Sequence, residues 1–141
     1  PGQGAGMDLD TVPGDRLGPA LRGFGVNLLV RDAGAAVAFL TATFGMTAHQ
    51  AGRDFAVMVY RGQPFQLHSD ASFARHPLHA LLPEAGPRGA GAELRLYDSD
   101  PETAVEAAPG AGGIVLAAPA DKTGHGLREA VILSPAGHAW M

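Results

Sequence analysis

The sequence has no cysteine, few aromatic residues and little charge of either sign. Without cysteine the chain can form no disulfide, supply no thiolate nucleophile and build no cysteine-ligated zinc site. Lysine and arginine together number 10, against 14 aspartate and glutamate residues, so the net charge is −4. Nucleic-acid binding depends on clustered positive charge. We therefore expect no nucleic-acid partner.

Long hydrophobic runs are also missing. The longest apolar stretches fall far short of the roughly 18 residues that a membrane-spanning helix needs. The first residues lack the basic and apolar regions of a secretory signal. We therefore expect no membrane partner and a cytoplasmic location. A chain of 141 residues with 46% apolar residues is typical of one globular domain with its own core.

The chain divides into a leader and a body. Residues 1–22 are rich in glycine and contain Pro13 and Pro19, and we predict a flexible leader, in part of non-native origin. The body is predicted to be a single domain of residues 23–141. Its three parts are a first unit, a connection rich in proline and glycine, and a second unit, at 23–70, 71–90 and 91–141.

One pattern begins the first unit. The segment 26–30 alternates in the manner of a β-strand. Asp32 follows, and aspartate favours the N-cap of a helix because its carboxylate accepts hydrogen bonds from free amides. A helical stretch then leads to Gly45, which suits the left-handed conformation that ends many helices. This order predicts a strand followed by a helix.

The same pattern returns 68 residues later. Segment 93–97 alternates, Asp100 is placed as an N-cap, and Gly113 lies near the predicted helix end. Further strands are predicted after each helix, at 46–51, 55–60 and 65–69 in the first unit and at 114–117, 128–133 and 137–141 in the second. The repetition indicates two tandem βαβββ units.

Tandem βαβββ units resemble the vicinal oxygen chelate superfamily, which includes glyoxalase I, extradiol dioxygenases, fosfomycin-resistance enzymes and bleomycin-binding proteins. The motifs that carry the resemblance are Val30-Arg31-Asp32, Phe39-Leu40, Phe44-Gly45-Met46, and His125–Glu129 followed by Ser134–His138. The resemblance implies an α+β fold in which the two units form a half-barrel cleft. It also implies a homodimer.

Metal-dependent members of this superfamily carry four ligands on equivalent strand positions. By resemblance these positions are Gly25, Gln66, Glu93 and Met141. Glycine has no side chain to donate, and a methionine thioether is too soft for the metals that the superfamily uses. We therefore predict no metal and no other cofactor.

Strand parity predicts which side chains face the cleft. Glu93 and Arg95 lie two residues apart on one strand face, and a carboxylate beside a guanidinium has a lowered pKa, so it is a poor general base at neutral pH. We therefore predict no catalytic residue. The predicted ligand-binding side chains are Asn27, Leu29, Phe55, Gln66, His68, Glu93, Arg95, Tyr97 and Met141.

The resulting hypothesis is a metal-independent protein that binds a small aromatic or cationic, antibiotic-like molecule, as drug-sequestering resistance proteins of the superfamily do. On this interpretation the protein is not an enzyme. One alternative is a metal-dependent lyase, isomerase or dioxygenase with a shifted metal site at Gln66, His68 and Glu93. A second alternative is a domain that acts through a protein partner.

Overall fold

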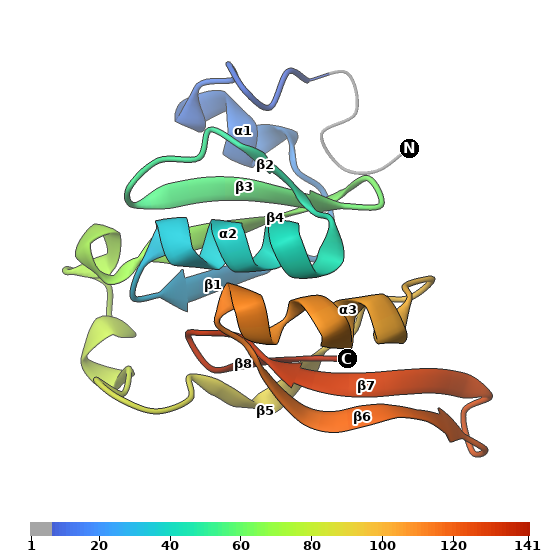
Figure 1. Ribbon diagram of the computed structural model, residues 1–141. Helices are drawn as coiled ribbons and strands as arrows, with labels where there is room; N and C mark the ends of the chain where they lie inside the picture. The colour runs from blue at the N-terminus through green and yellow to red at the C-terminus, as the bar shows by residue number, and fades with distance from the viewer. Residues whose placement is uncertain (1–6) are drawn as a thin grey trace.

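The computed structural model describes residues 7–141. Two four-stranded sheets lie next to each other, and each carries a helix on the same side of the molecule (Figure 1). This arrangement confirms the predicted α+β class. None of the helices in the described range combines the length and apolar character required to cross a bilayer.

The first unit follows the predicted order of elements. Its sheet has the strand order β1-β4-β3-β2, in which β1 runs parallel to β4 and the other neighbours are antiparallel. The elements are β1 (Asn27–Val30), α2 (Ala33–Phe44), β2 (Thr47–His49), β3 (Phe55–Tyr60) and β4 (Gln63–Ser69).

Local signals set the ends of α2. The Asp32 carboxylate accepts a hydrogen bond from the backbone N–H of Ala35 at 3.1 Å, which satisfies one of the free amides of the first turn. Gly45 has a φ of +69°, and its N–H bonds back to the last turn of the helix. Both predicted caps are confirmed.

The second unit repeats this topology with the strand order β5-β8-β7-β6. Asp100 caps its helix by accepting from the N–H of Glu102 at 3.0 Å, as predicted. The elements are β5 (Gly89–Leu94), α3 (Pro101–Ala107), β6 (Ile114–Lys122), β7 (Leu127–Leu133) and β8 (His138–Trp140). Three short 3-10 turns lie in the connections: η1 (Asp70–Phe73), η2 (His79–Leu81) and η3 (Pro109–Ala111).

Two details differ from the sequence prediction. β5 begins at Gly89 and ends at Leu94, whereas the alternation had predicted a strand at 93–97. The early part of β5 has only small residues, so it carries no alternation, and its pairing with β8 makes it a strand. Helix α3 ends at Ala107, earlier than the Gly113 that marks the predicted helix end, and Gly112 has a φ of +95°.

The main core lies between the two helices and the sheet faces that they cover. Phe39 is fully buried, and its ring meets Phe44 edge to face at 5.7 Å. Trp140 of the second sheet packs against Phe44 and Phe65 of the first unit, with ring centroids 5.6 and 5.9 Å apart. Burial of each large side chain stabilises a fold by about 1.5–3 kcal/mol. One continuous core therefore joins the two units.

The leader is partly ordered, contrary to the flexible segment predicted for residues 1–22. Residues Gly14–Ala20 form helix α1, and Leu17 is buried. The Gln50 side-chain amide donates to the carbonyls of Leu9 and Val12 at 2.9 and 2.7 Å, and this anchors the segment before α1. The tertiary contacts explain the helix, because its own sequence contains glycine and proline. Residues 1–6 lie outside the described part.

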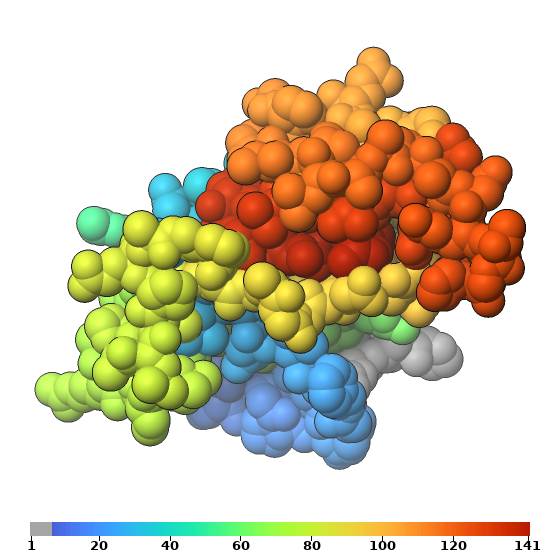
Figure 2. Space-filling model, turned by 90° about the horizontal axis from the view of Figure 1, so that it is seen from below, coloured from blue at the N-terminus to red at the C-terminus, as the bar shows by residue number. Residues whose placement is uncertain are grey.

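The connection between the units is fixed by two arginines. The Arg31 side chain donates to three backbone carbonyls of the connection at 2.9–3.0 Å. The Arg88 side chain, only 3% exposed, binds both carboxylate oxygens of Asp70 at 2.5 and 2.8 Å. Seen from below, the β5 segment (yellow) lies between the last strands (red) and the segment that contains β1 (blue) (Figure 2). The connection therefore brings the first strands of the two units close to each other.

Candidate binding site

The second sheet has a gap beside β7. β8 pairs with β7 only at Ile132 and Leu133, so within residues 7–141 the first part of β7 has β6 on one side and no strand on the other. The β6–β7 hairpin extends well beyond β8 (Figure 1). A cavity of about 300 Å³ opens here, between the chain that continues from β5, the start of β7 and helix α3.

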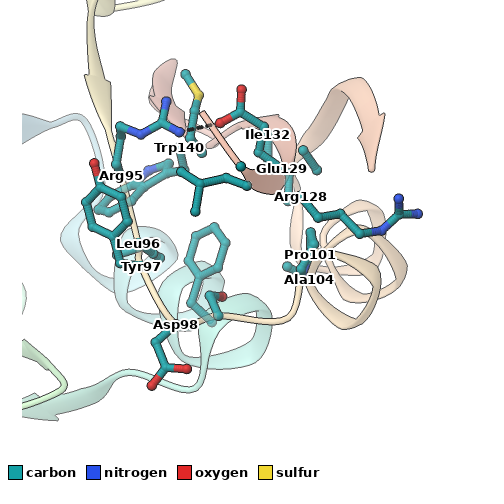
Figure 3. A pocket seen from close by; sticks show the side chains of 16 residues that line it. Arg95, Leu96, Tyr97, Asp98, Pro101, Ala104, Arg128, Glu129, Ile132 and Trp140 are labelled. Carbon is teal, nitrogen blue, oxygen red and sulfur yellow. Dashed lines mark hydrogen bonds and ion pairs between the residues drawn. The ribbon is translucent and has the colours of Figure 1, made fainter. Parts of the chain in front are cut away.

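The walls of this cavity are mostly apolar. Helix α3 contributes Ala104 (Figure 3). The C-terminal end of α2 contributes Phe44. Trp140 is buried, and among the described residues its Nε1 finds no hydrogen-bond acceptor. Ligand pockets typically have such a lining, with few polar groups to orient the ligand. The other apolar side chains of the lining are Leu96, Pro101, Leu127, Ala130, Ile132 and Met141.

An ion pair crosses one side of the cavity. The guanidinium of Arg95 donates to the carboxylate of Glu129 on β7 (Figure 3). A second nitrogen of Arg95 lies 3.3 Å from the carboxylate of Glu93. Arg128 also borders the cavity, but its side chain points away from it (Figure 3) and pairs with Glu102. One guanidinium thus faces two carboxylates, and the local charge is negative.

The ion pair fixes the charge of its members. The hydrogen bond from Arg95, together with the positive charge of its guanidinium, holds the pKa of Glu129 below its usual range, although partial desolvation acts against both. The same hydrogen bond raises the pKa of Arg95. A carboxylate with a lowered pKa is a weak proton acceptor at neutral pH. The pair can orient a ligand through charge-assisted hydrogen bonds and is poorly suited to proton transfer.

The rim of the cavity is held by the first unit. The Tyr60 hydroxyl donates to the carbonyl of Tyr97 at 3.4 Å. Arg61 donates to the carbonyl of Asp98 at 2.5 Å, and Asp98 has a φ of +56°. This is the left-handed region, which aspartate tolerates better than most residues. The rim is therefore a turn fixed from outside, with the ring of Tyr97 5.8 Å from the guanidinium of Arg95.

The structure divides the predicted ligand-binding residues among several places. Arg95, Tyr97 and Met141 line the cavity described above. Glu93 does not line it and reaches it only through its ion pair with Arg95. The first-unit residues lie elsewhere.

Asn27 and Gln66 border a separate cavity of about 270 Å³, which helix α1 helps to enclose. Gln66 is also tied to His68, with 3.2 Å between its Oε1 and the histidine Nε2. Burial lowers the pKa of His68.

The two remaining predicted residues serve local packing. The Phe55 ring packs against His68 with ring centroids 5.1 Å apart, and Phe73 of η1 packs against the same imidazole at 5.0 Å, both in tilted orientations. The carbonyl of Leu29 accepts a hydrogen bond from Arg88 at 3.5 Å. Neither Phe55 nor Leu29 lines the 300 Å³ cavity. The nine residues therefore do not form one site in this chain.

Sequence reasoning missed Glu129, Phe44 and Trp140 as lining residues. Glu129 lies in a strand that alternates, and its parity opposes that of the buried Ala130 and Ile132. That signal could have identified it as a partner for Arg95. Nothing in the local sequence indicates that Phe44, on a helix of the first unit, reaches this cavity.

The residues at the four metal-ligand positions do not fit a metal. Gly25 offers no donor and borders the cavity under α1, whereas Met141 lines the cavity in the second sheet. The carboxylate of Glu93 is engaged by Arg95. No three His, Asp or Glu side chains within 7–141 are grouped so that they could hold a metal ion.

Solved structures with the same fold are known at low sequence identity. A glyoxalase/bleomycin resistance protein/dioxygenase family enzyme from Burkholderia phytofirmans PsJN has a TM-score of 0.66 and 20% identity, covering 82% of this chain and 91% of its own. A glyoxalase/bleomycin resistance protein/dioxygenase from Nocardioides has a TM-score of 0.60 and 23% identity, with coverages of 84% and 81%. TioX from Micromonospora sp. ML1 has a TM-score of 0.58 and 22% identity, with coverages of 84% and 95%.

No protein-family model and no curated protein sequence matches the chain. The structural likenesses confirm the fold that the tandem units predicted, with coverage of most of this chain and of each neighbour. At these identities they show the fold alone. Function has to be argued from the site.

Proposed function

We propose that this protein binds a small planar aromatic molecule stoichiometrically in the cavity of the second sheet, without a metal. The observation that supports the proposal most directly is the cavity itself, with its aromatic and aliphatic walls and one ion pair at the side. Its volume of about 300 Å³ lies at the lower end of the range for small-molecule sites. Phe44, Tyr97 and Trp140 provide the ring surfaces.

The charges beside the cavity favour a cationic ligand. Glu93 and Glu129 both face the guanidinium of Arg95, which leaves one uncompensated negative charge. A cation placed near the two carboxylates gains electrostatic energy, whereas an anion must compete with Glu129 for Arg95. The overall charge of −4 acts in the same direction over longer distances.

Binding without turnover fits these groups better than catalysis does. Glu129 is the best-placed carboxylate, and its lowered pKa makes it a weak base. For the alternative of a shifted metal site, Gln66 and His68 do contact each other, but the pairing of Glu93 with Arg95 leaves them without their third ligand. We therefore propose sequestration as in bleomycin resistance proteins, a description that several proteins of this fold carry.

We also propose that the protein is a homodimer. Ile114 and Leu116 lie two residues apart on the edge strand β6 and are 58% and 57% exposed, so this edge presents apolar surface. A second copy could cover them. Light scattering should give twice the chain mass, and Leu116→Glu should reduce it to one chain mass. A monomeric wild-type protein would contradict the proposal.

The binding proposal is tested by comparing two three-ring probes of similar shape. Isothermal titration with 9-aminoacridine, a cation, and with 9-anthracenecarboxylate, an anion, should show one saturable site per chain. The cation is expected to bind about tenfold more tightly, because of the excess carboxylate. Saturable binding by neither probe at submillimolar concentration would contradict the proposal, and tighter binding of the anion would contradict its charge assignment.

A further inference from the structure

A third cavity, of about 140 Å³, lies between the two units. Its walls come from β1 and α2 of the first unit and from the turn between β7 and β8 of the second. It shares only Trp140 with the candidate binding site in the second sheet. Its apolar lining is nearly continuous and includes Leu28, Val30, Phe39, Leu40, Leu67 and Trp140.

The imidazole of His138, in the lining of this cavity, has no hydrogen-bond partner among residues 7–141. His138 lines the cavity and is 8% exposed. Its backbone N–H and carbonyl are both bonded to the hydroxyl of Ser134, but its imidazole makes no hydrogen bond or ion pair with any residue in 7–141. The ring nitrogens are not among the fully buried polar atoms that lack a partner, so they keep some access and can bond to a small molecule.

The imidazole is held firmly in position. Gly89 of β5 packs directly on it, and a Cβ atom at this glycine would come within 2.7 Å of the histidine Cδ2. Only glycine allows the ring and the strand to approach so closely. The unpartnered ring is therefore built into the junction between β5 and β8 and is not a mobile surface group.

The other polar groups around the cavity already have partners. The Asp32 carboxylate caps α2, the guanidinium of Arg31 binds carbonyls of the connection, and Ser134 is bonded to the backbone of His138. The indole Nε1–H of Trp140 lies buried without an acceptor in the described chain, and Trp140 lines both this cavity and the one in the second sheet.

The surroundings keep His138 neutral. Burial lowers its pKa, and the positive charges of Arg88 and Arg31 lower it further. A neutral imidazole offers one N–H donor and one acceptor nitrogen. It suits a hydroxyl group, which can donate and accept, and does not favour a carboxylate or an ammonium group.

We propose that this cavity between the units is a second binding site, for a single-ring phenol whose hydroxyl bonds to the His138 imidazole. A dry protein cavity of about 150 Å³ with a similar lining accepts one benzene ring, so the size is suitable. Phe39 and Leu40 provide the apolar contact for the ring. The proposal does not depend on the function proposed for the second-sheet cavity, because the two cavities share only Trp140 and His138 lines this one alone.

The experiment uses phenol and toluene, which share the ring and differ in the hydroxyl. Phenol is titrated into the ¹⁵N-labelled protein while the imidazole resonances of His138 are followed by NMR. One saturable site should shift these resonances. His138→Leu should weaken phenol binding about fivefold to tenfold, as expected for one lost hydrogen bond, and should leave toluene binding unchanged or tighter.

Two further variants locate the site. Ala35 lies at the exposed edge of the cavity, and Ala35→Phe should block the mouth and abolish saturable phenol binding. Tyr97→Ala changes only the second-sheet cavity and should leave phenol affinity unchanged. The proposal is overturned if phenol does not shift His138 in the wild-type protein, or if Ala35→Phe binds phenol normally. The proposal would also be overturned if His138→Leu weakened toluene binding as much as it weakened phenol binding.

Discussion

Arg95 and Glu129 form an ion pair that spans the gap between the chain after β5 and the start of β7. β8 separates these two segments near Trp140 but does not extend to the level of the pair. The cavity lies beside this pair (Figure 3).

Removal of the Glu129 charge should change which ligands bind. In Glu129→Gln the guanidinium of Arg95 keeps only Glu93 as an anionic partner, so the affinity for 9-aminoacridine should fall about fivefold to tenfold. The affinity for 9-anthracenecarboxylate should rise. Titration calorimetry measures both. Glu106→Gln, which removes one charge from an exposed position of α3, is the control, and an equal effect of both variants would argue against the assigned charge recognition.

A second pair of variants distinguishes two cavities. Tyr97 lines the cavity in the second sheet, whereas Gln66 lines the cavity under α1. Tyr97→Ala should therefore weaken 9-aminoacridine binding by about 1–2 kcal/mol, and Gln66→Ala should leave it unchanged. Titration calorimetry measures the affinity of both variants for 9-aminoacridine. If Gln66→Ala alone weakened binding, the ligand would belong under α1.

The Asp70–Arg88 pair should contribute stability that depends on pH. Hydrogen bonds from Arg88 hold the pKa of Asp70 below its ordinary value. A carboxylate with a lowered folded-state pKa stabilises the fold above its unfolded pKa of about 3.9, and this contribution is lost as the pH falls through the folded-state pKa. Asp70→Asn should cost about 1–3 kcal/mol at pH 7 and less at pH 3.

Urea unfolding at the two pH values measures this difference, with Glu106→Gln as the control for a charge that has no such partner. A cost that stays constant, or that grows as the pH falls, would show that the ionised form of Asp70 is not what stabilises the connection.

The leader should loosen when its anchor is removed. Gln50 has a φ of +49° and uses its side-chain amide to bind the carbonyls of Leu9 and Val12. In Gln50→Ala these carbonyls lose their donors, so amide hydrogen exchange in residues 8–20 should become faster by about tenfold. Mass spectrometry of peptides from this segment measures the exchange rate in the wild-type protein and in the variant. Exchange that is fast already in the wild-type protein would contradict the ordered α1.

The repeated architecture could be predicted from the sequence because its signals are local. Asp32, Gly45 and Asp100 act through neighbouring residues, so their type and spacing were sufficient. Helix α1 could not be predicted in this way, because its segment contains Gly18 and Pro19 and its order depends on the burial of Leu17. In that segment tertiary contacts outweigh a poor helix propensity.

The candidate site was less predictable because it depends on distances between elements. Strand parity identified Arg95 and Tyr97 as facing one cavity, which they line. It could not show that the second-unit site is separate from Gln66 and His68, or that Phe44 of α2 reaches it. Both facts depend on how the two units pack against each other, and no single segment of the sequence determines this packing.

The central claim is binding without a metal. The most direct test is the dissociation constant of 9-aminoacridine measured before and after removal of divalent metal with a chelator, with the metal content of both samples determined by plasma mass spectrometry. We expect less than about a tenth of an equivalent of any transition metal in the untreated protein and the same affinity in both samples. A near-stoichiometric metal whose removal abolishes binding, and whose return restores it, would contradict the account.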